Sequence, residues 1–145
     1  MKIRAANADD VPAILEIRLS VRENMVTKER LEELGVSEES LAEMIESSHF
    51  VFCAEEEDRV VGFSMADKDK ATIFALFVDP DHEGKGVGAK LLDTSVGELW
   101  SAGHARATLT TEPDTRAFEF YKRQGWKLIG PAPNGEVRLE LLKPD

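Results

Sequence analysis

The chain has 145 residues, of which 42% are hydrophobic and 32% charged, enough to bury the core of one domain and unlike the composition of a disordered chain. Its formal net charge of −10 disfavours nucleic-acid binding, which needs a basic surface, and mildly favours a cationic partner such as an amine. We predict one cytoplasmic domain over residues 1–145 that contacts no membrane. No apolar run reaches the roughly 20 residues that cross a bilayer, and the N-terminus lacks a signal-peptide pattern. The single cysteine, Cys53, cannot form an internal disulfide, which fits a reducing compartment.

The first half of the chain predicts a strand, two capped helices and a hairpin. Asn7 or Asp9 can cap the first helix and Ser37 the second, since both are followed by apolar residues at helical spacing. Between these helices, residues 22–35 are charged and only weakly periodic, which indicates a loop with a short helix. An acidic turn from Glu55 to Asp58 joins the hairpin strands. The ranges are 2–6 for the strand, Val11 to Leu19 for the first helical face, 37–47 for the second helix and 50–67 for the hairpin.

The second half predicts three further strands and two longer helices around a glycine-rich turn. Residues 71–78 are almost entirely apolar, which is typical of a strand buried on both faces. Gly125 is placed to end the second of these helices. The helices span 87–103 and 114–124, and the strands after the turn span 105–111, 126–130 and 136–142. The element order β-α-α-β-β-β-α-β-α-β-β describes a mixed α/β domain without repeats.

The stretch FVDPDHEGKGVGAKLL carries glycines at 84, 86 and 88 between a strand and a helix, a pattern that frees backbone N–H groups to approach a phosphate. A Walker A loop is excluded because position 89 is alanine and no Ser or Thr follows Lys90. A dinucleotide fingerprint is nominally met by Gly84, Gly86 and Ala89, but His104-Ala105-Arg106 stands where its acidic residue belongs. A glycine-rich turn without a ligand is the remaining structural alternative.

The residues on both sides of the turn carry a more specific resemblance. LFVDPDHEGKGVGAKLL resembles the acyl-CoA-binding motif of the GCN5-related N-acetyltransferases (GNAT family), in which a strand ending Val-x-Pro precedes Gln/Arg-x-x-Gly-x-Gly/Ala. TEPDTRAFEFYKRQGWK resembles the next block of that family, with Ala117, Tyr121, Gly125 and Trp126 in register. The resemblance covers essentially the whole chain, least clearly residues 22–48. It implies a single-domain α/β fold with a mixed, mostly antiparallel sheet flanked by helices.

Two positions depart from the family pattern. Glu83 stands where Gln or Arg is usual, so its carboxylate must turn away from a bound pyrophosphate or pair nearby, and Lys85 and Lys90 can offset its charge. Asp114 stands where Asn is frequent, so its side chain accepts hydrogen bonds but does not donate them. Neither change removes the backbone donors of the turn.

The resemblance implies transfer of an acetyl group from acetyl-CoA to a primary amine of a small molecule or peptide by direct attack. The pyrophosphate is expected on the N–H groups of residues 84–89, and the pantetheine arm beside residues 76–78. A backbone N–H near Phe77 or Val78 is expected to stabilise the thioester oxygen as it gains charge. The residues implied to bind the cofactor are Leu76, Phe77, Val78, Gly84, Lys85, Gly86, Val87, Gly88, Ala89, Asp114 and Tyr121.

Tyr121, the only tyrosine, is the implied general acid that protonates the leaving thiolate. The family's usual base positions fall at Thr72 and Leu109, which cannot take a proton, so Glu112, Asp67 or a chain of waters remain as candidates. The three histidines, at 49, 82 and 104, lack metal-ligand spacing, and we predict no metal.

Acceptor choice is expected to lie in the carboxylate-rich segment 22–48, which can attract an amine or simply form a solvated surface. The acceptor itself stays open. Homodimers are the commonest assembly of soluble proteins and are compatible with this sequence. The missing base carboxylate leaves a second reading, an acyl-CoA-binding regulatory module with the same fold and no catalysis.

Overall fold

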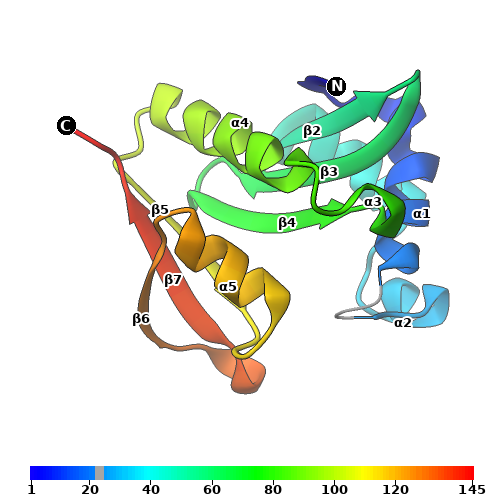
Figure 1. Cartoon of the computed structure of the whole chain (residues 1–145). Helices are drawn as coiled ribbons and strands as arrows, with labels where there is room; N and C mark the ends of the chain where they lie inside the picture. The colour runs from blue at the N-terminus through cyan, green and yellow to red at the C-terminus, as the bar shows by residue number, and fades with distance from the viewer. Residues whose placement is uncertain (22–24) are drawn as a thin grey trace.

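One seven-stranded sheet, in the order β1-β2-β3-β4-β5-β7-β6, organises the computed structural model, which describes residues 1–21 and 25–145 (Figure 1). Every neighbouring pair is antiparallel except β4 and β5, which are parallel. The mixed, mostly antiparallel sheet is therefore confirmed. The strands are β1 (Lys2–Ala5), β2 (His49–Glu56), β3 (Arg59–Asp67), β4 (Thr72–Val78), β5 (Arg106–Thr111), β6 (Lys127–Pro131) and β7 (Val137–Leu142).

Helices cover both faces of this sheet. The buried side chains of α1 pack with Val51 and Phe63, whereas those of α4 pack with Ala54 and Val61, so the two helices lie on opposite faces of β2 and β3. Figure 1 shows α5 beside the separate half formed by β5, β7 and β6. The helices are α1 (Val11–Ser20), α2 (Lys28–Glu33), α3 (Glu38–Glu43), α4 (Val87–Ser101) and α5 (Arg116–Arg123), with a π-helical turn at Met44–Ser48 and 3₁₀ turns at Ala8–Asp10, Pro80–His82 and Pro133–Gly135.

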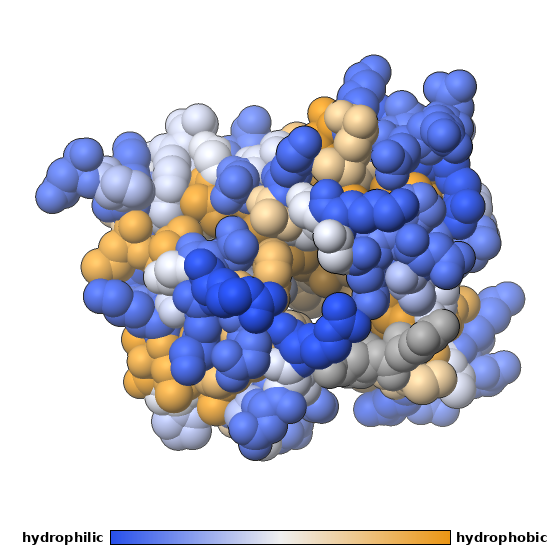
Figure 2. All heavy atoms as spheres, in the orientation of Figure 1, coloured by the Kyte–Doolittle hydropathy of each residue, from blue (hydrophilic) through white to orange (hydrophobic). Residues whose placement is uncertain are grey.

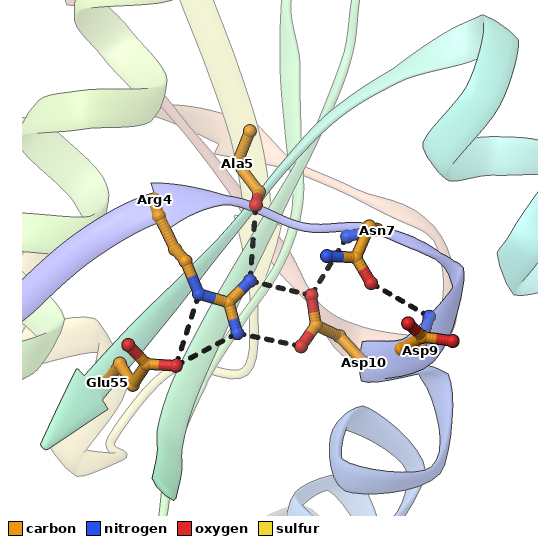
Figure 3. Close-up of polar contacts among 6 residues, drawn as sticks. All are labelled: Arg4, Ala5, Asn7, Asp9, Asp10 and Glu55. Atoms are coloured by element: carbon orange, nitrogen blue, oxygen red, sulfur yellow. Dashed lines mark hydrogen bonds and ion pairs between the residues drawn. The ribbon is translucent and has the colours of Figure 1, made fainter. Parts of the chain in front are cut away.

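A partly buried ion cluster fixes the start of the chain (Figure 3). Arg4 on β1 donates to both carboxylate oxygens of Asp10 at 2.8 Å and to Glu55 on β2 at 3.2 and 3.3 Å. Asp10 also accepts from the backbone N–H of Asn7 at 2.8 Å. The hydrogen bonds from Arg4 hold the pKa of the Asp10 carboxyl below its ordinary value. The cluster thus ties β1, β2 and the beginning of α1 together.

The capping residues expected from the sequence are found. Asn7 accepts from the N–H of Asp9 at 2.9 Å and opens the 3₁₀ turn before α1, and Ser37 accepts from the N–H of Ser40 at 3.2 Å at the start of α3. The expected short helix between them is α2, while positions 22–24 of that predicted loop lie outside the described residues. Cys53 is fully buried on β2, and burial raises the pKa of its thiol to about 12.

Two predicted boundaries are wrong, for backbone reasons. The hairpin turn is shorter than predicted because only Glu57 and Asp58 have positive φ (52° and 62°) and β2 continues to Glu56, as in two-residue hairpin turns. Helix α5 begins at Arg116 because Asp114 has φ 62°, outside helical values, and the Thr115 hydroxyl caps the helix by accepting from the N–H of Phe118 at 3.1 Å.

Strand β4 is not buried on both faces, contrary to the prediction. The register with β3 passes from Met65 opposite Ala75 to Ala66 opposite Ile73, so Phe74 is an extra residue that forms a β-bulge. The side chain of Phe74 is 55% exposed. No helix in the described ranges is long and apolar enough to cross a membrane.

Candidate active site

The two parallel strands β4 and β5 separate after a single residue pair. Within the described residues they pair only at Thr72 and Thr108, whose hydroxyls lie 3.1 Å apart, and the N–H of Thr108 donates to the carbonyl of Ala71 at 3.0 Å. Figure 1 shows the strands diverging from this point. Beyond Thr72 and up to Val78, no strand in the described residues pairs with this edge of β4. Backbone N–H and carbonyl groups on this edge can therefore pair with another partner.

The register shows which residues of β4 face this open edge. The N–H of Asp79 donates to the carbonyl of Val61 at 2.8 Å, so Asp79 faces β3. Alternate residues of a strand direct their backbone groups to opposite edges, and the pairing is continuous from Ser64 opposite Leu76 to Gly62 opposite Val78. Phe77 therefore faces β3, whereas Leu76 and Val78 turn their N–H and carbonyl groups toward the open edge.

The glycine turn brings backbone donors to the end of this edge. Gly84 and Gly86 have φ of 77° and 83°, values that side chains rarely allow. Gly86 is the N-cap of α4, no side chain in the described part of the chain caps it, and the backbone N–H of Lys90 donates to its carbonyl at 3.2 Å. The N–H groups before Lys90 thus lack intrahelical acceptors at the positive end of the helix dipole. This donor set fits a phosphate group.

The space in front of the turn is open. A Cβ atom added to Gly84 or Gly86 would meet no heavy atom within 4 Å. At Gly88 an added Cβ would instead lie 3.6 Å from the Phe120 ring and 3.8 Å from a methyl of Val78. Gly88 is therefore the point at which the first turn of α4 meets the end of β4 and, through the Phe120 ring, α5.

The carboxylate of Glu83 is paired across this junction. Arg116, the first residue of α5, donates to it at 2.8 Å, and their side chains are 74% and 38% exposed. This ion pair connects the glycine turn to the other half of the domain. It compensates the charge of Glu83, a role that the sequence suggested for Lys85 and Lys90.

Tyr121 lies on α5 in the core shared by α4 and the second half of the sheet. Its side chain is 8% exposed and packs edge-on against Phe120 and Trp126, with ring centroids 5.3 and 6.1 Å away. Burial raises the pKa of the Tyr121 hydroxyl above its ordinary value, so the phenol holds its proton at neutral pH. A protonated phenol is the form that a general acid needs.

The two side-chain candidates for the base lie at opposite ends of the diverging strands. Asp67 ends β3 and accepts from the N–H groups of Asp69 and Lys70, both at 3.0 Å; these bonds, chiefly that from Lys70, hold the pKa of its carboxyl below the ordinary value. It lies opposite Thr72, where the strands are still paired. Glu112 is exposed and directly follows β5, at the end where the strands have separated.

The histidines are dispersed. His49 contacts Phe74, His82 lies 3.9 Å from Glu56, and His104 makes a 2.6 Å hydrogen bond to the carbonyl of Lys68. In the residues that the structure describes, no three His, Cys, Asp or Glu side chains come together as a metal site.

Arg18, a residue that the sequence patterns did not single out, lies on the other face of β4. Its guanidinium is 4.5 Å from the centre of the Phe77 ring, and partial burial lowers its pKa. The spacing in the sequence already places Arg18 on the sheet-facing side of α1, because it follows Val11 and Ile14 at helical intervals.

The fold and site together define an α/β domain in which an open strand edge is followed by a glycine turn whose backbone donors fit a phosphate group. Residues 22–136 match the family model of the acetyltransferase (GNAT) domain. The chain therefore belongs to the GNAT family.

Curated relatives match this chain over part of their length. The peptidyl-lysine N-acetyltransferase YjaB of Salmonella typhimurium is 28% identical over 93 residues, which cover 64% of this chain and 60% of that protein. Mycothiol acetyltransferase of Propionibacterium freudenreichii is 34% identical over 82 residues, or 52% of this chain and 26% of that protein.

A solved structure supports the fold along the whole chain. The PaiA N-acetyltransferase of Thermoplasma acidophilum, determined in complex with coenzyme A, has a TM-score of 0.85 and 18% identity and covers 97% of this chain and 98% of its own. At this identity the likeness defines the fold alone, and the expected GNAT fold is confirmed.

Proposed function

We propose that this chain is an N-acetyltransferase that moves an acetyl group from acetyl-CoA to a primary amine by direct attack. One observation carries the proposal: the open edge of β4 ends beside the first turn of α4, where a Cβ added at Gly88 would lie 3.8 Å from Val78 and where no described side chain caps the helix. The N–H groups from Gly86 to Ala89 would hold the pyrophosphate, and the backbone of Leu76 and Val78 would pair with the amides of the pantetheine arm. Family membership and the coenzyme A complex of the PaiA enzyme support this choice of cofactor.

Acetyl-CoA would supply the activated acyl group, and the chain would supply the hydrogen bonds and protons around it. Of the two expected donors to the thioester oxygen, the register favours Val78, because Phe77 turns its N–H toward β3. A preorganised donor of this kind contributes about 2.7–4 kcal/mol to catalysis. It costs no reorganisation, since the strand already holds it in place.

Tyr121 would protonate the sulfur as the thiolate leaves. Its phenol is protonated at neutral pH and is held by packing on both sides. The amine must lose a proton before or during attack. Glu112 or water would receive that proton, since Asp67 already accepts two backbone hydrogen bonds at the paired end of the strands.

To test this role of Tyr121, wild type and Tyr121→Phe are compared by calorimetric titration with acetyl-CoA and by CoA release over a panel of amines. We expect the variant to bind acetyl-CoA with unchanged affinity and to have a kcat about 10²–10⁴-fold lower, the range for loss of a general acid. An unchanged kcat across the pH range would remove Tyr121 from this role.

A binding module without catalysis is the second candidate, favoured by the side chains at the usual base positions. Thr72 is hydrogen-bonded to Thr108, and Leu109 is buried in the core with 2% exposure. Under this alternative, acetyl-CoA raises the melting temperature but no amine in the panel releases CoA. Release of CoA together with an N-acetylated product identifies the enzyme.

A further inference from the structure

A groove runs along the outer side of α1, where this helix meets α2 and α3. Two adjoining hollows form the groove, one of about 520 Å³ and one of about 410 Å³, and both are lined by Pro12 and Glu38. Figure 1 shows α1, α2 and α3 together on one side of the molecule, away from β5, β6 and β7. Among the described residues, none from β4, α4 or α5 lines either hollow, and α4 lies on the opposite face of the sheet. The groove is therefore separate from the candidate cofactor site.

Apolar side chains from all three helices and the loop between α2 and α3 line this groove. In the larger hollow, Leu31 is buried, Leu15 and Val36 are half-buried, and Leu19 is 37% exposed. Ala42 of α3 continues the apolar surface into the smaller hollow. Concave apolar surface that is partly open to water gains free energy when a partner covers it. The groove therefore favours an occupant that has apolar side chains.

The charged side chains that line the groove are almost all acidic. Among the described residues they are five exposed carboxylates and one basic group, that of Lys28. Figure 2 shows hydrophilic side chains gathered on the side where Figure 1 places these helices, with apolar atoms between them. In the ranges that the structure describes, none of the five carboxylates takes part in an ion pair. The five belong to Asp9, Glu16, Glu32, Glu38 and Glu39.

We propose that this groove binds a cationic amphipathic segment of a partner protein, in which apolar residues form one side and Lys or Arg residues flank them. The apolar side chains of the segment would cover Leu15, Leu19 and Leu31, and its cations would pair with the carboxylates. A second copy of this chain is a poor occupant, because its net charge is −10 and like charges would meet. Anionic lipid surfaces and nucleic acids are repelled for the same reason.

The test is calorimetric titration of the full chain with two synthetic peptides of about fifteen residues that contain only leucine and lysine. In the first peptide the leucines recur at helical spacing and form one face, and in the second the same residues are shuffled so that no face is apolar. We expect the Kd of the first peptide to be about tenfold or more below that of the second. Equal affinity would mean that charge alone attracts the peptide, and it would overturn the proposal.

A pair of double variants tests the place of binding. Glu16→Gln with Glu38→Gln neutralises two carboxylates of the groove and should raise the Kd of the first peptide about fivefold or more. Asp93→Asn with Glu119→Gln is the matched control, because it makes the same change in net charge at exposed positions of α4 and α5. Its Kd should stay within about twofold of wild type, since salt screens charges that lie far from the peptide.

The apolar part of the groove is tested in the same way. Leu19→Ser should raise the Kd of the first peptide about three- to tenfold because apolar contact is lost. Leu142→Ser, at a 60% exposed position on β7, should leave it unchanged. Equal weakening by the groove variants and their controls, or no binding of the first peptide to wild type, would overturn the proposal. The titrations contain no acetyl-CoA, so their result is independent of the proposed function.

Discussion

Gly86 is expected to serve both the stability of the fold, through its left-handed backbone, and the binding of acetyl-CoA, through the open space in front of α4. Its φ of 83° costs an alanine about 1–2 kcal/mol, which corresponds to a fall of about 2–8 °C in melting temperature for a domain of this size. A Cβ there would also project into the open space before the donors of α4. Loss of one charge-assisted hydrogen bond of about 1.5–3 kcal/mol would weaken acetyl-CoA binding about 10- to 100-fold. Gly86→Ala is therefore expected to lower both stability and affinity.

Two further variants distinguish these effects. Gly97 lies inside α4 and a Cβ there meets no atom within 4 Å, so Gly97→Ala should raise stability by about 0.5–1 kcal/mol and leave acetyl-CoA affinity unchanged. Asparagine tolerates positive φ, so Gly86→Asn should keep most of the stability while its side chain still obstructs the cofactor.

The assay is urea unfolding of each variant together with calorimetric titration of acetyl-CoA. If Gly86→Ala is as stable as Gly97→Ala, the left-handed backbone of the turn is not required. If Gly86→Ala and Gly86→Asn both bind acetyl-CoA with the affinity of wild type, the turn does not hold the pyrophosphate, and the proposed cofactor site is refuted.

Two other predictions concern charged groups. Glu83→Gln removes a carboxylate beside the proposed phosphate site and an exposed ion pair of about 0.2–1 kcal/mol. We expect the Kd of acetyl-CoA to fall about 1.5- to 5-fold at low salt, because a negative charge near the phosphates is lost. A higher Kd in calorimetry would contradict this prediction. Asp10 has a lowered pKa because Arg4 donates to it, so it contributes stability above its ordinary pKa of about 3.9 that is lost as pH falls through its lower folded value. Urea unfolding at a series of pH values should accordingly show Asp10→Asn less stable than wild type at neutral pH, with the difference shrinking under acid; a constant difference would argue against this linkage.

Local signals in the sequence predicted most of the fold. Caps such as Asn7 and Ser37 and the stop at Gly125, whose φ is 96°, act within a few residues and are readable without knowledge of the partner strands. The errors lie where backbone conformation departs from side-chain preference. Asp114 follows an extended segment and precedes α5, and its positive φ moved the helix start by two residues.

The open edge of β4 could not be predicted in the same way. Its apolar residues are those of a strand enclosed on both sides, but pairing with β5 ends after Thr72 because of how two distant segments meet. The bulge at Phe74 and the place of Arg18 over Phe77 depend on the same long-range register. A one-residue change in register would turn side chains to the opposite face, and neither register nor divergence is encoded by local spacing.

The candidate cofactor site is made mainly of backbone, and this explains why the two departures from the family pattern leave its architecture intact. The donors at the start of α4 and along β4 belong to the main chain, so the side chain at position 83 can change provided its charge is compensated, as it is by Arg116. At position 114 the backbone needs φ 62°, a conformation that asparagine and aspartate both accept. Aspartate therefore meets this backbone requirement as asparagine would. A nonpolar β-branched residue at 114 would be expected to disturb the start of α5, and with it the position of Tyr121, more than the exchange of amide for carboxylate does.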